Sequence, residues 1–197
     1  MIKHLSFVRL TVLSAVAATF FAVALPVKVH ADTTQHASVT LKMADGAQVA
    51  ISDAPNINFG TTAINSNGTD KDADNIDAPV TVTNPGFADG WTLKVAASNF
   101  TDAQTNRTIK SAQMTFDTAT VAADDQNNVS AAPVAQQAVL TTGGAAQKIV
   151  GAADHAGVGT FSATFNPSNV HLHIPAGNVE GNYSADLTWT LVNGVED

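Results

Sequence analysis

The chain has 197 residues, 45% of them hydrophobic, which is enough for one domain that buries a core of its own. Its nine basic and seventeen acidic residues give a net charge of −8, so neither nucleic acid nor an anionic lipid surface is expected as a partner. The sequence contains no cysteine, which removes disulfides, thiol nucleophiles and cysteine-ligated zinc from consideration.

Residues 1–31 have the pattern of a secretory signal peptide. Lys3 and Arg9 precede an uncharged apolar run, "TVLSAVAATFFAVAL", and small residues end the segment at Ala31. That run of fifteen residues is shorter than the roughly 20 needed to span a bilayer. We therefore expect cleavage after Ala31 and no membrane insertion of the mature chain. Cleavage leaves six basic residues against seventeen acidic ones, a net charge of −11.

The mature chain, residues 32–197, is predicted to be all-β. Short runs of alternating polar and apolar residues, separated by Gly, Pro, Asn and Asp, are typical of strands. They lie near residues 38–43, 48–52, 57–60, 79–84, 90–98, 111–119, 137–142, 147–152, 159–165, 170–174 and 183–192. This spacing favours a single-domain β-sandwich with Greek-key-like connections, with a barrel as the alternative. The polar stretches at 65–78 and 122–136 are predicted to be loops.

Both tryptophans begin a Trp-Thr-Leu triplet, at residues 91–93 and 189–191. Side chains alternate between the faces of a strand, so Trp91 and Leu93 share one face, as Trp189 and Leu191 do. One interpretation is that both indoles are core residues that face each other across the sandwich. The alternative is a surface platform on which sugar rings stack, because a large indole is often incompletely buried.

Two groups of polar residues are candidate metal ligands. Asp70, Asp72 and Asp74 have the alternate carboxylate spacing of a calcium loop, but the glycine and glutamate that an EF-hand needs further on are missing. His171 and His173 share a strand face and could chelate zinc or copper, yet no third ligand is evident nearby. We therefore predict a solvated acidic loop, a solvent-facing histidine pair and no metal site, with the three aspartates as weak candidates.

Sequence signatures of catalysis are scarce. The chain has no nucleophile elbow, no H-E-x-x-H zinc motif and no phosphate-binding loop. A pair of carboxylates acting on a glycoside depends on their separation in space, so a carbohydrate-active enzyme stays a remote alternative. The sequence favours a protein that is not an enzyme and needs no cofactor.

Several segments in their order along the chain carry a resemblance to a known family. They are "INFG", "VTVTN", "GWTLKVAASNF", "AQMTF", "TTGGAAQKIV", "GVGTF" and "NVEGNYSADLTWTL". Together they resemble the WxL domain of Gram-positive surface proteins, which is named for its Trp-x-Leu motifs. The likeness covers nearly all of the mature chain. It implies that residues 32–197 form a secreted domain that attaches non-covalently to the cell wall, with Trp91, Leu93, Trp189 and Leu191 as its motif residues.

The resemblance also implies partners. Peptidoglycan or another wall polymer is the expected ligand, and Phe87, in the loop before Trp91, is a candidate for stacking on its sugars. WxL or WxL-interacting surface proteins are the other expected partners. The chain could thus be a subunit of a surface complex that binds such a protein rather than glycan.

Overall fold

The structure, a computed structural model, describes residues 36–195. The chain divides into Met1–Thr40 and Leu41–Asp197, and all of its described strands lie in the second unit. The predicted signal peptide lies outside the described residues and stays a prediction. Among residues 36–195, no helix is long and apolar enough to cross a membrane.

The described residues are built from short strands and one 3₁₀ turn. In chain order they are β1 (Ala50–Asp53), β2 (Ile57–Asn58), β3 (Thr69–Asp72), β4 (Asn75–Ile76), β5 (Val80–Asn84), β6 (Trp91–Ala97), β7 (Thr101–Asp102), β8 (Gln113–Phe116), β9 (Thr120–Ala123), β10 (Val134–Ala135), β11 (Ala138–Thr141), β12 (Gln147–Ala152), β13 (Gly159–Thr164), η1 (Pro167–Asn169), β14 (Val170–Ile174), β15 (Tyr183–Ser184) and β16 (Leu187–Asn193). The predicted all-β class is therefore confirmed.

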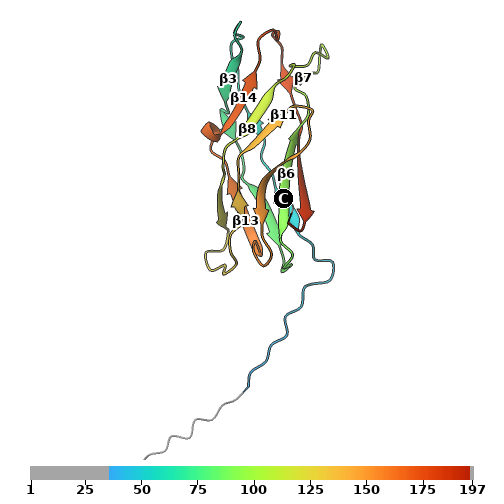
Figure 1. The fold of residues 1–197 in the computed structure, drawn as a ribbon, viewed down its shortest axis with the longest axis vertical. Coiled ribbons are helices and arrows are strands. Elements are labelled where there is room, and N and C mark those ends of the chain that lie inside the picture. The colour runs from blue at the N-terminus through green and yellow to red at the C-terminus, as the bar shows by residue number, and fades with distance from the viewer. Residues whose placement is uncertain (1–35, 196–197) are drawn as a thin grey trace, which may run out of the picture. The chain divides into compact units, whose positions relative to one another are not determined.

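The strands form three antiparallel four-stranded sheets, in the orders β1-β5-β13-β9, β10-β12-β6-β16 and β11-β8-β14-β3. Two small ribbons, β15-β7 and β2-β4, accompany them. Figure 1 shows β3, β14 and β8 towards one end of the strand-bearing unit and β13 towards the other. None of these sheets closes on itself, so the sandwich is confirmed and the barrel alternative is wrong. Neighbours far apart in sequence, such as β6 and β16, agree with Greek-key-like connections.

Aromatic rings join strands of different sheets in the core. The Phe116 ring meets Phe165 edge to face, with centroids 5.3 Å apart, and meets Trp189 in the same manner at 6.0 Å. Phe116 and Phe165 are buried, whereas Trp189 is half-buried. Edge-to-face pairs stabilise a core beyond the burial of their area, so this cluster fixes β16 against β8 and the segment that follows β13.

The two Trp-Thr-Leu triplets lie on neighbouring strands of one sheet. β6 and β16 pair antiparallel, with Leu93 opposite Leu191, Val95 opposite Trp189 and Trp91 opposite Asn193. Directly opposed residues point to the same face. The expectation that the indoles face each other across the sandwich is therefore wrong: they share a face, at different points along the same strand pair.

Trp91 occupies a closed slot. Its side chain is 1% exposed, and its indole N–H donates a hydrogen bond to the Gly157 carbonyl oxygen, 3.1 Å away. Gly157 has φ of +64°, and a Cβ there would lie 2.8 Å from the indole nitrogen and 2.6 Å from the Ala152 Cβ. Only glycine accepts both that backbone conformation and that close approach. Trp91 thus belongs to the core.

The structure departs from the predicted strands in two ways. Residues 38–43 belong to no strand and are exposed, although their alternation predicts one. Conversely, β3 and β4 lie in residues 65–78, which were predicted as a loop, and β10 lies within the second predicted loop. β3 is polar on both faces, with Asp70 and Asp72 opposite His173 and His171 and with Thr69 and Lys71 opposite Ile174 and Leu172, so hydrophobic alternation could not reveal it.

Candidate functional site

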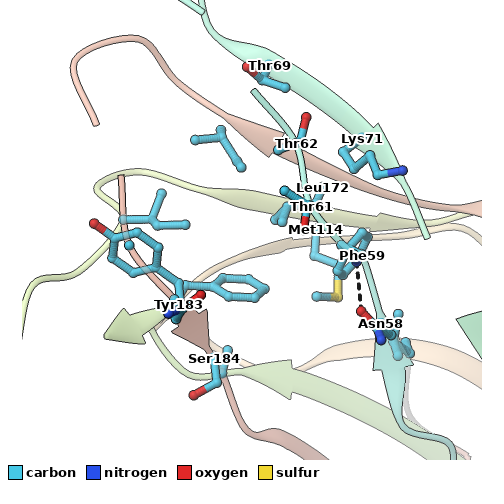
Figure 2. A pocket seen from close by; sticks show the side chains of 18 of the residues that line it. Asn58, Phe59, Thr61, Thr62, Thr69, Lys71, Met114, Leu172, Tyr183 and Ser184 are labelled. Atoms are coloured by element: carbon cyan, nitrogen blue, oxygen red, sulfur yellow. Dashed lines mark hydrogen bonds between the residues drawn. The ribbon is translucent and has the colours of Figure 1, made fainter. Parts of the chain in front are cut away.

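A groove with a volume of about 1140 Å³ opens beside β16. One wall is formed by residues 54–65 and the other by residues 178–187. Buried side chains of β8 and β14, Met114 and Leu172, lie at its base, and Trp189 also lines it. Figure 2 shows side chains from both walls converging over this apolar base.

The first wall is tied down by hydrogen bonds to two residues outside it, the carboxylate of Asp77 and the backbone of Asp74. The Asn56 backbone N–H and side-chain amide donate to the two oxygens of Asp77, at 2.7 and 2.8 Å. These hydrogen bonds, the side-chain one foremost, lower the pKa of Asp77 below its ordinary value. The Asp74 N–H donates to the Asn58 carbonyl oxygen at 2.7 Å. The position of this wall is therefore not fixed by the two-residue strand β2 alone.

Asp102 holds the second wall. Its carboxylate accepts the backbone N–H groups of Gln104 and Thr105, both at 2.9 Å, and of Asn182 at 3.0 Å. The Thr105 bond, followed by that of Asn182, lowers the pKa of Asp102. The charged form is thus the one that these donors stabilise. Because Asn182 precedes β15, this carboxylate fixes the position of Tyr183 in the groove.

The lining combines aromatic rings with hydroxyl and amide groups. Tyr183 and Phe59 come from opposite walls, and Figure 2 shows Phe59 beside Met114 and Tyr183 further away on the other side of Met114. The Tyr183 hydroxyl donates to the Val179 carbonyl oxygen at 3.0 Å, which orients the ring. The side-chain oxygen of Asn58 accepts the Gly60 N–H at 2.7 Å. Such a lining suits a ligand with both apolar faces and hydroxyl or amide groups.

The structure brings one of the four motif residues to this groove. Trp189 lines it, whereas Trp91, Leu93 and Leu191 do not. Trp91 and Leu93 are each 1% exposed, and Leu191 is half-buried. The division of the motif between core and groove was not evident from the sequence, because both triplets have the same alternation.

Phe87 lies apart from the groove lining. It is half-buried in the loop between β5 and β6, where its N–H donates to the Asn84 side-chain oxygen at 2.8 Å and its carbonyl accepts the Asn84 amide at 2.9 Å. Asn84 is itself fully buried. The loop is therefore held rigidly, and the stacking role of Phe87 stays a prediction at a second location.

The candidate metal ligands are engaged with other side chains across β3 and β14. Asp72 lies 2.7 Å from His171 Nδ1, and Asp70 lies 2.6 Å from His173 Nδ1. Asp74 instead forms an ion pair with Lys71. No group of three His, Asp or Glu side chains in residues 36–195 could hold a metal ion.

His171 lies between two carboxylates. Hydrogen bonds to Asp72 and then to Asp117, which is 3.2 Å from its Nε2, raise the pKa of His171 above 6.5. The protonated form is thus favoured in the folded state, and its contribution to stability is present below about pH 6.5 and lost as pH rises through the raised pKa. Hydrogen bonds from the Gln137 amide, and then from His171, lower the pKa of Asp117. The contribution of Asp117 to stability is therefore lost as the pH falls through this lowered pKa.

We expect His171→Gln to lower the free energy of unfolding more at about pH 5.5 than at about pH 8.5. Urea unfolding at both pH values measures this difference. The matched control is His155→Asn, in an exposed loop where the backbone has φ of 60°, which asparagine tolerates. A loss that is equal at the two pH values would show that His171 acts by packing rather than by charge.

Sequence reasoning missed Asp102 and the ring of Phe59 as parts of the site. Asp102 stands in a polar stretch where nothing marks one carboxylate as buried, although it is only 6% exposed. Phe59 was placed in a predicted strand, and no local pattern says that this strand forms the wall of a groove. Only the spatial arrangement of distant segments shows these roles.

Comparison with known proteins identifies a family. A family model described as WxL domain surface cell wall-binding matches residues 26–194. That range holds both Trp-Thr-Leu triplets and all strands of the described residues. Neither the curated proteins nor the solved structures give a match.

Proposed function

The chain belongs to the WxL family of surface domains that bind the cell wall, and we propose that the polymer it binds there is peptidoglycan. The domain is extracellular and associated with the wall. Residues 32–197 are proposed as the mature wall-binding unit, freed by cleavage after Ala31. Attachment is proposed to be non-covalent, through many weak polar contacts and aromatic stacking.

The groove beside β16 is the observation that supports this proposal. Rings of Phe59, Tyr183 and Trp189 line it, and sugar rings have apolar faces that stack on such surfaces. Amide and hydroxyl groups of Asn58 and Ser184 lie among them, as Figure 2 shows. These groups match the hydroxyl and acetamido groups of a wall glycan.

We propose binding without hydrolysis. The groove contains two carboxylates from its second wall, Glu180 and Asp186, and both are exposed to solvent. A general acid for glycoside cleavage needs a raised pKa, which burial in apolar surroundings supplies. Neither carboxylate has such surroundings. The family description names binding alone, which supports the same conclusion.

Co-sedimentation of purified residues 32–197 with bare peptidoglycan tests the proposal. We expect the wild-type chain to sediment with the polymer and to release no reducing sugar. Tyr183→Ala should weaken binding by about tenfold, or 1.4 kcal/mol, because it removes a ring from the groove.

Phe87→Ala is the comparison variant, because it removes the other ring that is predicted to stack on sugars, a half-buried ring outside the groove. Since we propose the groove as the main site, its loss should weaken binding less than the loss of the Tyr183 ring. Weakened binding for Phe87→Ala with unchanged binding for Tyr183→Ala would move the site to the loop before β6. If the wild type released reducing sugar and Glu180→Gln abolished that release, the function would be catalysis rather than binding alone.

A second candidate function is that of a subunit in a surface complex. The observation that favours it is the outer edge of β16, which no strand of residues 36–195 covers. Such an edge is a site for pairing with another polypeptide. Sedimentation with bare peptidoglycan in the absence of any other protein discriminates between the two functions, since a pure complex subunit would stay in the supernatant.

A further inference from the structure

Strand β3 has the groove on one face and Asp–His pairs on the other. Thr69 and Lys71 line the groove, and Figure 2 shows both on one strand at its edge. Asp70 and Asp72 point to the opposite face, because side chains alternate along a strand. β3 ends its sheet, and among residues 36–195 its one strand partner is β14. Contacts between β3 and β14 on the far face therefore help to fix an edge of the groove.

The first wall of the groove is attached to β3 and to the turn that follows it. The Thr69 hydroxyl donates to the Ala63 carbonyl oxygen at 3.2 Å, and the Asp74 N–H donates to the Asn58 carbonyl oxygen at 2.7 Å. The Asp74 carboxylate also occupies the space that a Cβ on Gly60 would need, so the two segments are in close contact. A loosened β3 would therefore loosen this wall as well.

On the far face, His171 of β14 lies between two carboxylates that come from different neighbours. Its Nδ1 is 2.7 Å from the Asp72 carboxylate of β3, and its Nε2 is 3.2 Å from the Asp117 carboxylate directly after β8. A neutral imidazole has one N–H, so it donates to one carboxylate and turns a lone pair towards the other. The protonated ring donates to both. Protonation therefore clamps β3 and the end of β8 onto β14.

The surroundings of His171 are mostly uncharged apart from these carboxylates. The titratable groups that the strand pairing and the hydrogen bonds place beside it are Asp70, Asp72, Asp117 and His173. The uncharged neighbours from β8, from β11 and from the residue before β11 are Gln113, Thr115, Val139, Thr141 and Gln137. The described contact of His173 is with Asp70, 2.6 Å from its Nδ1, so the neutral form of His173 can keep that hydrogen bond.

We propose that protonation of His171 strengthens binding in the groove, because it holds β3 against β14 and thereby keeps the first wall of the groove in place. This inference rests on the groove as the site that binds the wall polymer. The pKa of His171 is raised above 6.5, so the effect is complete in mildly acidic solution and is lost as pH rises through that pKa. The ion pairs are partly exposed, which limits the effect to about two- to fivefold.

Hydrogen exchange tests the link between His171 and the groove without any ligand. After correction for the intrinsic exchange rate, the Asp74 N–H that binds Asn58 should be about two- to fivefold better protected at about pH 5.5 than at about pH 8.5. Amides of β6 should change less. His171→Gln should remove the difference at Asp74, whereas the matched control His173→Gln, on the same face of β14, should keep it. Equal changes at Asp74 and in β6 would mean that protonation acts on the whole fold, and would refute the coupling.

Asp117→Asn is a second variant, which leaves the histidine in place. The asparagine amide can donate to the neutral Nε2 of His171, so the deprotonated ring no longer faces a carboxylate there. The pH dependence of protection at Asp74 should therefore be smaller than in the wild type. An unchanged dependence would show that the two carboxylates around His171 are not the cause, and the proposal would fail.

Co-sedimentation with bare peptidoglycan measures the regulation of binding itself. The wild type and His173→Gln should bind about two- to fivefold more tightly at about pH 5.5 than at about pH 8.5, and His171→Gln should bind equally at both. Lys71, Glu180 and Asp186 in the groove are common to all three proteins, so their own titration cancels in the comparison.

The two measurements separate failure of the regulation from failure of the ligand. No sedimentation at either pH, together with the expected exchange difference at Asp74, would refute peptidoglycan as the ligand but not the link between His171 and the groove. Binding that does not depend on pH in the wild type, or an equal dependence in His171→Gln and His173→Gln, would overturn the proposed regulation.

Discussion

Replacing Trp91 by alanine should lower the free energy of unfolding by about 3–5 kcal/mol, the usual cost of removing a buried aromatic ring. The indole is 1% exposed and fills a slot bounded by Ala152 and Gly157, so the surrounding backbone cannot collapse into the cavity without breaking the β6–β12 pairing. Domains of this size are stable by about 5–15 kcal/mol, so the variant should be partly or wholly unfolded at room temperature. Urea unfolding followed by circular dichroism measures the loss.

Trp91→Phe separates the two contributions of this side chain. Phenylalanine keeps most of the apolar volume but cannot donate to the Gly157 carbonyl oxygen, which leaves a buried acceptor without its partner. Its cost should therefore lie between those of the wild type and Trp91→Ala, at about 1–3 kcal/mol. An alanine variant as stable as the wild type would mean that the slot is not closed around the indole.

Trp189→Ala should instead act mainly on wall binding. This indole is half-buried and lines the groove, so its removal should weaken binding to peptidoglycan by at least about tenfold, or 1.4 kcal/mol. Stability should fall by less than for Trp91→Ala, about 1–2 kcal/mol, because less apolar area leaves the core. Co-sedimentation and urea unfolding of the same preparation give both quantities.

Leu191→Ala is the matched control for Trp189. Leu191 lies two residues further along β16 on the same face, is also half-buried and does not line the groove. It should lose stability without losing affinity for the wall polymer. If both variants lose affinity in proportion to stability, the effect of Trp189 on binding is indirect, through the fold.

The positions of most strands were predictable from the sequence, because buried strands show a local alternation of polar and apolar residues. β5 and β6 have mostly Val, Leu and Trp at every second position, and their burial follows that period except at Thr92, which is also buried. The faces of β14 were predicted for the same reason: Val170 and Leu172 are buried, while His171 and His173 lie on the other side.

The arrangement of the strands was not predictable in the same way. Local alternation says which face of a strand is apolar but not which strand lies beside it, so the Leu93–Leu191 pairing could not be inferred. β3 is stabilised by cross-strand Asp–His pairs. Without knowledge of its partner strand, the polar sequence of β3 is typical of a loop. The groove combines segments that are more than a hundred residues apart, and Asp102 acts on it through backbone donors that a sequence does not display.

The pairing of Leu93 with Leu191 also constrains when this protein can fold. The central strand β6 stays an unpaired edge on one side until the chain beyond residue 187 is available, roughly a hundred residues later, and closing so long a loop is slow. The edge-to-face contact between Phe116 and Trp189 likewise forms only after β16 has been added to the sheet. The sheet that carries both Trp-Thr-Leu triplets is therefore completed only when the chain as far as residue 193 is available for pairing.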